Sequence, residues 1–461
     1  MDTLHADLLV IGFGKGGKTL AAAMGRAGKR VVMVEQSALL YGGTCINIAC
    51  VPTKALIHRA SQRPDDVEPR AWYEAAVAST DAMTAKMRDK NFRMLDTLDT
   101  VTVVTGTASF LDEKRIEVAA GEDRLEITAE AIVINTGAEP LVPDIPGLRE
   151  SACLITNTDL VRSPIMPRRV AVIGGGYQGL EFAALLSRYG IPVTVFESSE
   201  RILRREDDDV ARAAEAILRE EGIQFVTGAR VTEVVDGDGV ATVTYRTHEG
   251  DQGTIEAEAV LVGTGRSPRT AELRLEAAGV RTDDQGAIQV DTYLRTSRPH
   301  IFAVGDVNGG PQFTYVSLDD YRIVADQIMD TGTGKRTTAD RIAVPYTLFM
   351  TPPLGRVGMT EKEARSAGRS VRVAAKNVTE LMAMPRASIV GDTRGMMKFV
   401  VDAETDEILG AALLSIDSQE LINTVALAMR TGMTASQLRD AIWTHPSSTE
   451  AFNEVLANVV R

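Results

Sequence analysis

The chain has 461 residues, of which 44% are hydrophobic and 25% charged, and its formal net charge is -13. This length predicts about three domains of ordinary globular composition, and the acidic balance argues against a nucleic acid or an anionic membrane as partner. No apolar run reaches the roughly 18 residues that span a membrane, and only three cysteines are present, so we expect a cytoplasmic protein in a reducing compartment.

Residues 6–35 are predicted to form a strand, a glycine-rich turn, a helix and a second strand. Gly12, Gly14 and Gly17 have the spacing that lets a backbone turn approach a pyrophosphate and lets the helix pack on the strand. Glu35 ends the second strand, where its carboxylate would accept a hydrogen bond from an adenosine ribose. The pattern predicts a dinucleotide site; a loop that serves only helix packing is the alternative.

Two cysteines, Cys45 and Cys50, follow this unit. Five residues along a regular helix would place them about 7.5 Å apart, which exceeds the Cα separation of an ordinary disulfide. We therefore expect an irregular helix start that Gly42 and Gly43 permit and Thr44 caps, with Cys45 at the helix N-terminus, where the dipole favours a thiolate. A strained, half-exposed pair of this kind predicts a redox-active disulfide beside a flavin.

Two other interpretations of these cysteines remain open. They could be unpaired buried thiols, as Cys153 is expected to be, although the glycine pair and Lys54 make this less favourable. They could also form a metal clip, but His58 is the only other good ligand nearby.

The segment between the cysteines and the next glycine-rich turn is predicted to be mixed. Residues 72–98 have a helical composition, and residues 101–118 are predicted to be paired strands around positions 106–108. Residues 131–138 form a buried strand with small residues at its end, which would let the backbone reach a cofactor; a plain crossover turn is the alternative. Residues 140–164 have the composition of a domain boundary.

The strand, glycine turn, helix and strand pattern then recurs over residues 170–197. Gly174, Gly176 and Gly179 repeat the glycine spacing, and Glu197 repeats the terminal acid. Two such units predict two dinucleotides. One should be FAD and the other a nicotinamide, because a disulfide needs a carrier that takes a hydride and passes electrons to sulfur.

The residues after the second acid bear on the choice of nicotinamide. Glu197 is followed by Ser198 and Ser199, which favours a free 2'-hydroxyl and therefore NADH. Nearby arginines that could accommodate a 2'-phosphate weaken this preference, so that NADPH remains open: Arg201, Arg204 and Arg205.

Two later strands end in residues suited to a cofactor. The strand at 260–262 runs into small residues that include Gly265, and the strand at 301–304 ends in Asp306, whose carboxylate suits a ribityl or ribose hydroxyl. The segment 331–341 is predicted to be a boundary.

From residue 344 onward the pattern changes to strands at 398–401 and 409–414 and helices at 418–429 and 435–442, without a nucleotide signature. Near the end, His445 is followed by Glu450, a spacing suggestive of a base oriented by a carboxylate, although a lone histidine is usually structural.

In combination and order, these motifs resemble those of the pyridine nucleotide-disulfide oxidoreductases, a family that includes glutathione reductase, dihydrolipoamide dehydrogenase and mercuric reductase. The resemblance covers nearly the whole chain. It implies an α/β fold with two Rossmann-like, three-layer domains and a C-terminal α+β dimerisation domain. We expect an FAD domain at 1–150 completed by 271–343, an NAD(P)H domain at 151–270 and an interface domain at 344–461.

The resemblance also implies roles for individual residues. Cys50 would contact the flavin, and Cys45 would deliver electrons to the acceptor. If the acceptor is a metal ion, Cys45 and Cys50 would bind it only transiently, as a substrate. Lys54 would lie near the flavin N5 with Glu181 as its carboxylate partner. His445, oriented by Glu450, would act on the outer thiol from the partner subunit of an obligate homodimer.

The implied cofactor-binding residues fall into two sets. Those for FAD are Gly12, Gly14, Gly17, Glu35, Gly43, Thr44, Lys54, Ala108, Thr136, Gly137 and Asp306. Those for the nicotinamide nucleotide are Gly174, Gly176, Gly179, Glu181, Glu197, Gly265 and Tyr177, the last as an aromatic gate over the nicotinamide pocket.

Within the family, the segments 310–322 and 349–354 look most like a branch associated with resistance to reactive chlorine and with cupric reduction. The chain has no cysteine after Cys153, whereas mercuric reductases typically have a further pair near the C-terminus. We therefore expect Cu(II) or another oxidised small molecule as acceptor. The alternatives are a reductase like dihydrolipoamide dehydrogenase or mercuric reductase, and a redox-sensing flavoprotein with slow turnover.

Overall fold

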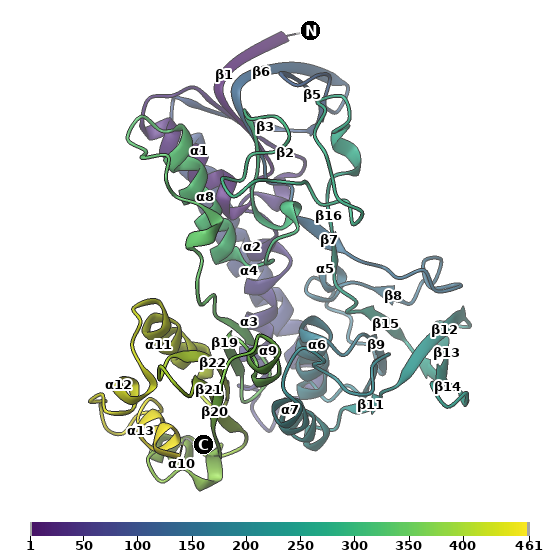
Figure 1. The fold of residues 1–461 in the computed structure, drawn as a ribbon. Helices are drawn as coiled ribbons and strands as arrows, with labels where there is room; N and C mark the ends of the chain where they lie inside the picture. The colour runs from purple at the N-terminus through teal and green to yellow at the C-terminus, as the bar shows by residue number, and fades with distance from the viewer. Residues whose placement is uncertain (1, 459–461) are drawn as a thin grey trace.

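The computed structural model describes residues 2–458. Three sheets of five or more strands, each with its own helices, form an upper part, a lower right part and a lower left part in Figure 1. Among the described residues, no helix is both long and apolar enough to cross a membrane.

The upper part is built on a seven-stranded sheet in the order β3-β2-β1-β6-β5-β4, with β17 paired to β6. The last residues of β1 are buried apolar side chains, a pattern typical of a parallel strand covered on both faces. The strands are β1 (Asp2–Ile11), β2 (Val31–Glu35), β3 (Val101–Thr105), β4 (Thr107–Phe110), β5 (Arg115–Ala120), β6 (Asp123–Ile134) and β17 (Ile301–Ala303).

The prediction of strands over residues 101–118 is confirmed, but the strands on the two sides of positions 106–108 do not pair with each other. β3 pairs in parallel with β2, while β4 pairs antiparallel with β5. Gly106 separates the two pairings: its N–H donates to the carbonyl of Glu35, and a Cβ on it would lie 2.6 Å from the carbonyl oxygen of Ala119. The chain therefore leaves the parallel part of the sheet at this glycine.

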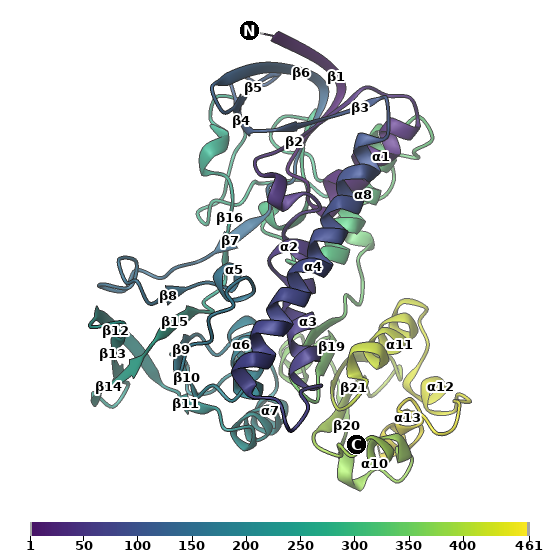
Figure 2. The ribbon, with the colours of Figure 1, turned by 180° about the vertical axis from the view of Figure 1, so that it is seen from behind.

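Helices cover this sheet and extend from it toward the lower parts. α1 packs against α8, and the long α4 runs down the back of the molecule beside α2 and α3 (Figure 2). α1 ends where Gly28 adopts a φ of +82°. The helices are α1 (Lys15–Arg26), α2 (Thr44–Asn47), α3 (Cys50–Ala60), α4 (Pro69–Asp96) and α8 (Thr314–Ile328).

The lower right part repeats the strand, turn, helix and strand arrangement around a five-stranded parallel sheet, order β11-β10-β9-β15-β8. An antiparallel meander, β12-β13-β14, extends from it. The elements are β8 (Leu154–Ile155), α5 (Asn157–Leu160), β9 (Val170–Ile173), α6 (Tyr177–Arg188), β10 (Val193–Phe196), α7 (Asp208–Glu220), β11 (Gln224–Val226), β12 (Ala229–Asp236), β13 (Ala241–Thr247), β14 (Gln252–Ala257) and β15 (Ala259–Val262). A two-stranded ladder of β7 (Ala138–Pro140) and β16 (Arg266–Pro268) joins the two parts.

The C-terminal part is an antiparallel sheet, order β18-β19-β22-β21-β20, covered by helices. The second predicted helix is shorter than expected, because α12 ends at Arg439. The elements are β18 (Tyr346–Leu348), β19 (Leu354–Gly358), α9 (Glu361–Ser366), β20 (Val371–Asn377), α10 (Pro385–Val390), β21 (Met396–Asp402), β22 (Ile408–Leu414), α11 (Ser418–Arg430), α12 (Ala435–Arg439) and α13 (Ala451–Val455). Short 3₁₀ turns lie at Ala38–Leu40, Ala271–Leu273, Gly305–Asn308, Thr338–Asp340, Val378–Glu380 and Leu456–Asn458.

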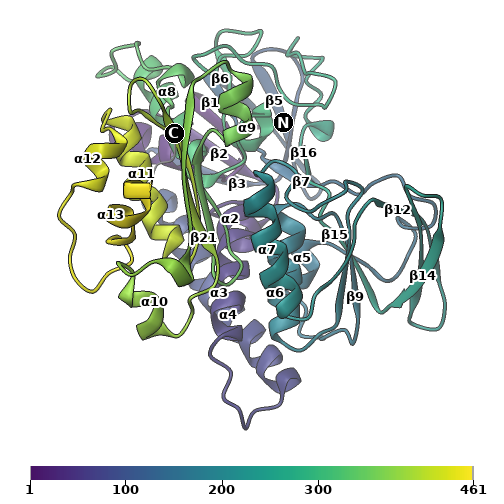
Figure 3. The same cartoon turned by 60° about the horizontal axis from the view of Figure 1, so that its bottom comes forward.

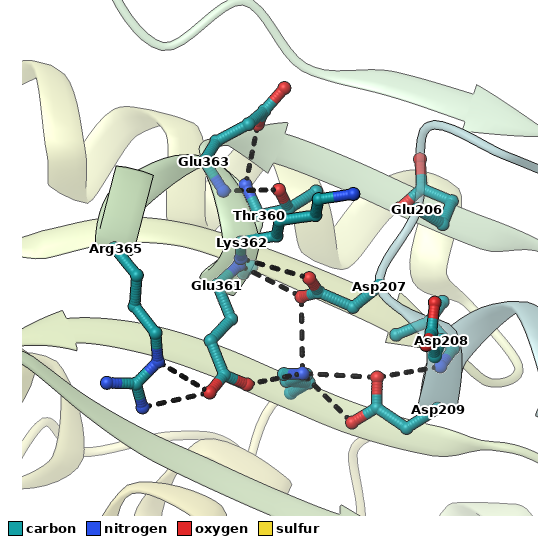
Figure 4. Close-up of polar contacts among 12 residues, drawn as sticks. Glu206, Asp207, Asp208, Asp209, Thr360, Glu361, Lys362, Glu363 and Arg365 are labelled. Carbon is teal, nitrogen blue, oxygen red and sulfur yellow. Dashed lines mark hydrogen bonds and ion pairs between the residues drawn. The ribbon is translucent and has the colours of Figure 1, made fainter. Parts of the chain in front are cut away.

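The lower right part and the C-terminal part share one apolar core. Figure 3 shows α6 and α7 lying between the C-terminal sheet and the sheet that contains β9 and β15, and apolar side chains from α6, α7, β19 and β22 pack together there. Beside this core, Lys398 of β21 is almost fully buried and forms ion pairs with Asp207 at 3.2 Å, Asp209 at 2.9 Å and Glu361 at 3.0 Å (Figure 4). This joint of Asp207, Asp209, Glu361 and Lys398 holds the start of α7 against the C-terminal sheet.

Candidate active site

A cavity of about 2140 Å³ opens among the three parts of the molecule. Most of the predicted cofactor and catalytic residues line it: Gly12, Gly14, Glu35, Gly43, Thr44, Cys45, Cys50, Lys54, Ala108, Thr136, Gly137, Tyr177, Glu181, Gly265 and Asp306. Among the described residues, the remaining predicted ones lie outside this lining: Gly17, Gly174, Gly176, Gly179, Glu197, His445 and Glu450. The structure thus brings most, but not all, of the predicted site together.

The first glycine turn forms a close-packed cradle at one end of the cavity. Gly12 has a φ of +100°, and a Cβ on it would lie 2.4 Å from the carbonyl oxygen of Asn135, so only glycine fits. Glu35 accepts hydrogen bonds from the N–H groups of Phe13 at 2.9 Å and Ser37 at 3.3 Å. Burial raises the pKa of Glu35, while these N–H groups oppose the rise. The cradle lets backbone N–H groups approach a pyrophosphate and has a carboxylate at its rim, which fits the dinucleotide predicted for it.

The second glycine turn has the same geometry. Gly174 has a φ of +110°, and a Cβ on it would lie 2.7 Å from the carbonyl oxygen of Gly263. Glu197 accepts from the N–H groups of Gly175 at 2.9 Å and Ser199 at 2.7 Å, as Glu35 does in the first unit. The two turns are therefore structural repeats, although only the first lines the large cavity.

The arginines near Glu197 have different surroundings. The guanidinium of Arg201 donates to the carbonyls of Leu203 at 2.9 Å and Glu206 at 2.8 Å and pairs with Asp208 at 2.9 Å. Its donors are thus engaged within its own loop, whereas Arg205 lines the cavity.

The two cysteines lie on either side of a break between two helices. Cys45 is within α2 and Cys50 is the first residue of α3. The chain between them leaves helical geometry at Ile48, with φ -143° and ψ 6°, and at Ala49, with φ -135° and ψ -108°. The carbonyl of Ile48 accepts a hydrogen bond from the Asn157 side chain at 2.7 Å. The predicted irregular start is confirmed, and it takes the form of this break.

The predicted capping role of Thr44 is wrong. Gly43 is the N-cap of α2, and Thr44 is its first helical residue. Gly42 and Gly43 have φ values of +95° and +84°, and a Cβ on Gly43 would lie 2.8 Å from the Cα of Gly14. Glycine holds the cap position because the turn passes directly against the nucleotide cradle, and Thr44 is thereby moved one position into the helix.

Cys45 and Cys50 are free thiols in this structure, so the predicted disulfide is not formed in it. The two thiols nevertheless lie close enough to influence each other's pKa, and Thr314 Oγ1 lies 4.0 Å from Cys50 Sγ. The interaction with the Cys50 thiol lowers the pKa of Cys45 to about 6, and the same interaction raises the pKa of Cys50. The pair therefore has the proximity that disulfide exchange needs and loses its first proton near neutral pH.

Lys54, one helical turn beyond Cys50, joins three parts of the molecule. Its Nζ lies 2.6 Å from Glu181 Oε2 of α6, and 4.8 Å from the ring centroid of Phe349. The other oxygen of Glu181 accepts from the Phe349 N–H at 3.0 Å. The predicted Lys54 and Glu181 partners are thus in contact at the cavity wall.

Lys18 is a charged residue of this region that sequence reasoning missed. It is buried on α1, and its Nζ donates to the carbonyl of Gly42 at 2.9 Å and to Asn91 Oδ1 at 2.5 Å. The equivalent position of the second glycine unit is the fully buried Leu180. The sequence signal that could have identified Lys18 is a lysine at a position where the second glycine unit has leucine. Its hydrogen bond to Gly42 shows that α1 supports the cysteine turn as well as packing on its strand.

Asp306 lines the cavity as predicted, beside an arginine that was not singled out. Burial raises the pKa of Asp306, and the positive charge of Arg266 opposes this rise. Arg266 lines the same cavity and donates to the carbonyl of Ala138. A half-buried carboxylate at this point suits a cofactor hydroxyl.

His445 and Glu450 form the predicted pair, at 2.9 Å between Nδ1 and Oε1. The N–H of Ser447 donates to the second oxygen of Glu450 at 2.8 Å, and this bond followed by the His445 contact lowers the pKa of Glu450. His445 is 72% exposed and lies outside the lining of the cavity of its own chain. Its predicted action on the cysteines of a partner subunit therefore stays a prediction.

Within residues 2–458, no three His, Cys, Asp or Glu side chains gather in an arrangement that could hold a metal ion.

Comparisons with known proteins match this arrangement over nearly the whole chain. Residues 6–320 match the family described as pyridine nucleotide-disulphide oxidoreductase, and residues 344–456 match the dimerisation domain of the same family. The chain is 43% identical over 451 residues to the probable pyridine nucleotide-disulfide oxidoreductase RclA of Escherichia coli, covering 98% of each chain. It is 35% identical to a mercuric reductase of Staphylococcus aureus, covering 94% of this chain and 79% of the relative, and 32% identical to a dihydrolipoyl dehydrogenase of Geobacillus stearothermophilus, covering 97% and 94%.

Solved structures give the same picture. The Cu(II) complex of the HOCl-induced flavoprotein disulfide reductase RclA from Escherichia coli superposes with a TM-score of 0.92 at 42% identity, covering 98% of this chain and 99% of the other. The predicted fold class, with two nucleotide-binding units and a dimerisation domain, is confirmed, and so is the resemblance to the chlorine-resistance branch.

Proposed function

The chain belongs to the pyridine nucleotide-disulphide oxidoreductases, and from that premise we propose that it uses NADH to reduce the Cys45 and Cys50 pair and passes the electrons to Cu(II) or another oxidised small acceptor in defence against reactive chlorine. The observation that carries the proposal is that Cys45 and Cys50, whose thiols influence each other's pKa, both line the cavity that contains the first glycine cradle. Oxidation of two thiols to a disulfide releases two electrons and two protons, enough to convert two Cu(II) ions to Cu(I).

FAD, when bound, supplies the capacity to accept a hydride and to pass electrons to sulfur. The Gly12 cradle would hold its pyrophosphate, and Glu35 and Asp306 would accept from its hydroxyl groups. Lys54 places a positive charge on the cavity wall, and Glu181 holds that ammonium in place at 2.6 Å. In this proposal, residues 1–150 and 271–343 form the FAD domain and residues 151–270 the nicotinamide domain, with Tyr177 as the gate to the nicotinamide pocket.

The contacts of Glu197 favour NADH over NADPH in the proposal. A 2'-phosphate would bring negative charge to the Glu197 carboxylate, and the guanidinium of Arg201 is already engaged by its own loop. We expect a higher kcat/KM for NADH than for NADPH. Equal values for the two nucleotides would contradict this preference.

Homodimer formation through residues 344–461 completes the proposal. The dimerisation domain match supports it, and so do large apolar side chains of this part that are exposed in the single chain, among them Met382 at 90% and Ile442 at 98%. The partner subunit would supply His445 to Cys45. We place the reaction in the cytoplasm, where reducing conditions let the pair cycle.

The test is anaerobic NADH oxidation with a panel of acceptors: Cu(II), lipoamide, oxidised glutathione and Hg(II). Cu(I) is followed with a chelating dye. Turnover with Cu(II) should be lost in Cys45→Ser and in Cys50→Ser and retained in Cys153→Ser, a matched control because Cys153 is buried outside the cavity lining.

Other results separate the alternatives. Turnover with lipoamide, glutathione or Hg(II) alone would identify another reductase of the family. Negligible turnover with every acceptor would favour a redox sensor. Full Cu(II) turnover in both serine variants would refute the proposed route through the cysteine pair.

A further inference from the structure

We propose that Glu206 is a positioning residue for Tyr177: it holds the tyrosine ring in the cavity wall, and Arg356 of the C-terminal part in turn holds Glu206. The affinity for the nicotinamide end of the nucleotide is thereby set from the C-terminal sheet. The inference rests on the proposed function, in which Tyr177 covers the nicotinamide pocket.

Tyr177 is fastened at two points. Its hydroxyl donates to Glu206 Oε1, and its ring packs edge-on against Tyr346, with the centroids 5.6 Å apart and an interplanar angle of 82°. The hydroxyl of Tyr346 donates to the same oxygen of Glu206 at 3.4 Å. Because Tyr177 is the first residue of α6 and lines the cavity, a nicotinamide that enters beneath the ring must break or bend these contacts.

Glu206 is fixed by a different part of the molecule from the one that contains Tyr177. Its side chain is 1% exposed, and Oε2 forms an ion pair at 2.5 Å with Nε of Arg356, which is 2% exposed. Arg356 lies in β19, paired on both sides in the C-terminal sheet, and donates to the carbonyl of Ala411 on β22. A buried carboxylate without such a partner would be strongly unfavourable, so the position of Glu206 follows the sheet.

The surroundings of the Tyr177 hydroxyl keep it protonated, so that it can donate a hydrogen bond. Burial, followed by the negative charge of Glu206, raises the pKa of Tyr177. The phenol therefore stays protonated and donates to Glu206, and hydrogen bonds to charged groups are stronger than neutral ones.

The neighbouring acids have another role, which provides a control. Asp207 and Asp209 bind Lys398, and Asp207 also accepts from the N–H groups of Glu361 and Lys362. In Figure 4 no dashed line joins Glu206 to Asp207, Asp209 or Glu361. Asp209→Asn therefore weakens the same joint between the two parts without touching the Tyr177 contact.

The experiment compares NAD⁺ with ADP-ribose, which lacks the nicotinamide, in calorimetric titrations of the flavin-loaded dimer. Tyr177→Phe removes only the hydroxyl and lowers the energy needed to move the ring. We expect the Kd for NAD⁺ to fall about tenfold, from the strength of a hydrogen bond to a charged group, and the Kd for ADP-ribose to stay unchanged. Asp209→Asn should leave the ratio of the two Kd values at the wild-type level.

Glu206→Gln should also tighten NAD⁺ binding, and it should have no added effect in the Tyr177→Phe background, because it acts through the tyrosine. An unchanged ratio of Kd values in Tyr177→Phe, or a Glu206→Gln effect of equal size in both backgrounds, would overturn the inference. If Glu206→Gln does not fold because Arg356 is left unpaired, Tyr177→Phe alone decides.

Tyr177→Ala separates this inference from the gate role itself. A changed ratio in Tyr177→Ala with none in Tyr177→Phe rejects only the anchoring by Glu206. No change in either variant rejects the gate role assigned to Tyr177 in the proposed function.

Discussion

Replacing Lys18 with methionine tests whether a charged lysine is buried beneath the cysteine turn. Burial, together with the nearby charge of Lys15, lowers the pKa of Lys18 from its ordinary value of 10.5 to about 8, while Cys45 opposes this change. Its side chain is 5% exposed, so solvent screens this effect little. At about 1.4 kcal/mol per pKa unit, the charged form destabilises the folded state by about 3 kcal/mol relative to a lysine in water.

The sign of the pH dependence follows from proton binding. Between pH 8 and pH 10.5 the folded chain holds fewer protons at Lys18 than the unfolded chain does, so the free energy of unfolding rises with pH across this window. We expect the difference between wild type and Lys18→Met to change by about 2.5 kcal/mol in favour of wild type from pH 7 to pH 10. At pH 7 alone the variant is less informative, because methionine removes the buried charge but also leaves Gly42 O and Asn91 Oδ1 without this donor.

Urea unfolding followed by circular dichroism at several pH values measures this difference. Lys29→Met is the control, because Lys29 is a partly exposed lysine that pairs with Asp330 at 3.1 Å near the end of the same helix, and exposed pairs contribute little. The free energy of unfolding of Lys29→Met should change with pH in the same way as that of the wild type. Parallel curves for wild type and Lys18→Met would refute the reasoning.

Two further predictions concern the proposed reaction. Glu181→Gln keeps the acceptor for the Phe349 N–H but removes the negative charge at Lys54, and stopped-flow absorbance should show flavin reduction by NADH slowed about tenfold; an unchanged rate would contradict the role of the pair. His445→Gln should lower acceptor turnover about a hundredfold, and mixed dimers with Cys45→Ser subunits should regain about a quarter of wild-type turnover, since half of the dimers would then have one intact site. No recovery on mixing would place His445 outside the partner's site.

Several features of this protein follow from short stretches of sequence. The two glycine turns, the acids that end their second strands and the break at the cysteines were all predictable, because each depends on backbone geometry within a few residues. The pairing of His445 with Glu450 also follows from local spacing. These motifs in order were sufficient to predict the family and its fold.

Other contacts depend on how the three sheets pack. Lys54 and Glu181 lie 127 residues apart in sequence and meet because α3 packs on α6. The pairing of β3 with β2, the support of Gly42 by Lys18 and the burial of Glu206 against Arg356 could not be predicted, because hydrophobic periodicity reports which face of an element is buried and not which element covers it. The sequence alone therefore determined the chemical groups and the local turns that present them, and the tertiary structure decided which charges meet, since that depends on the packing of elements distant in the chain.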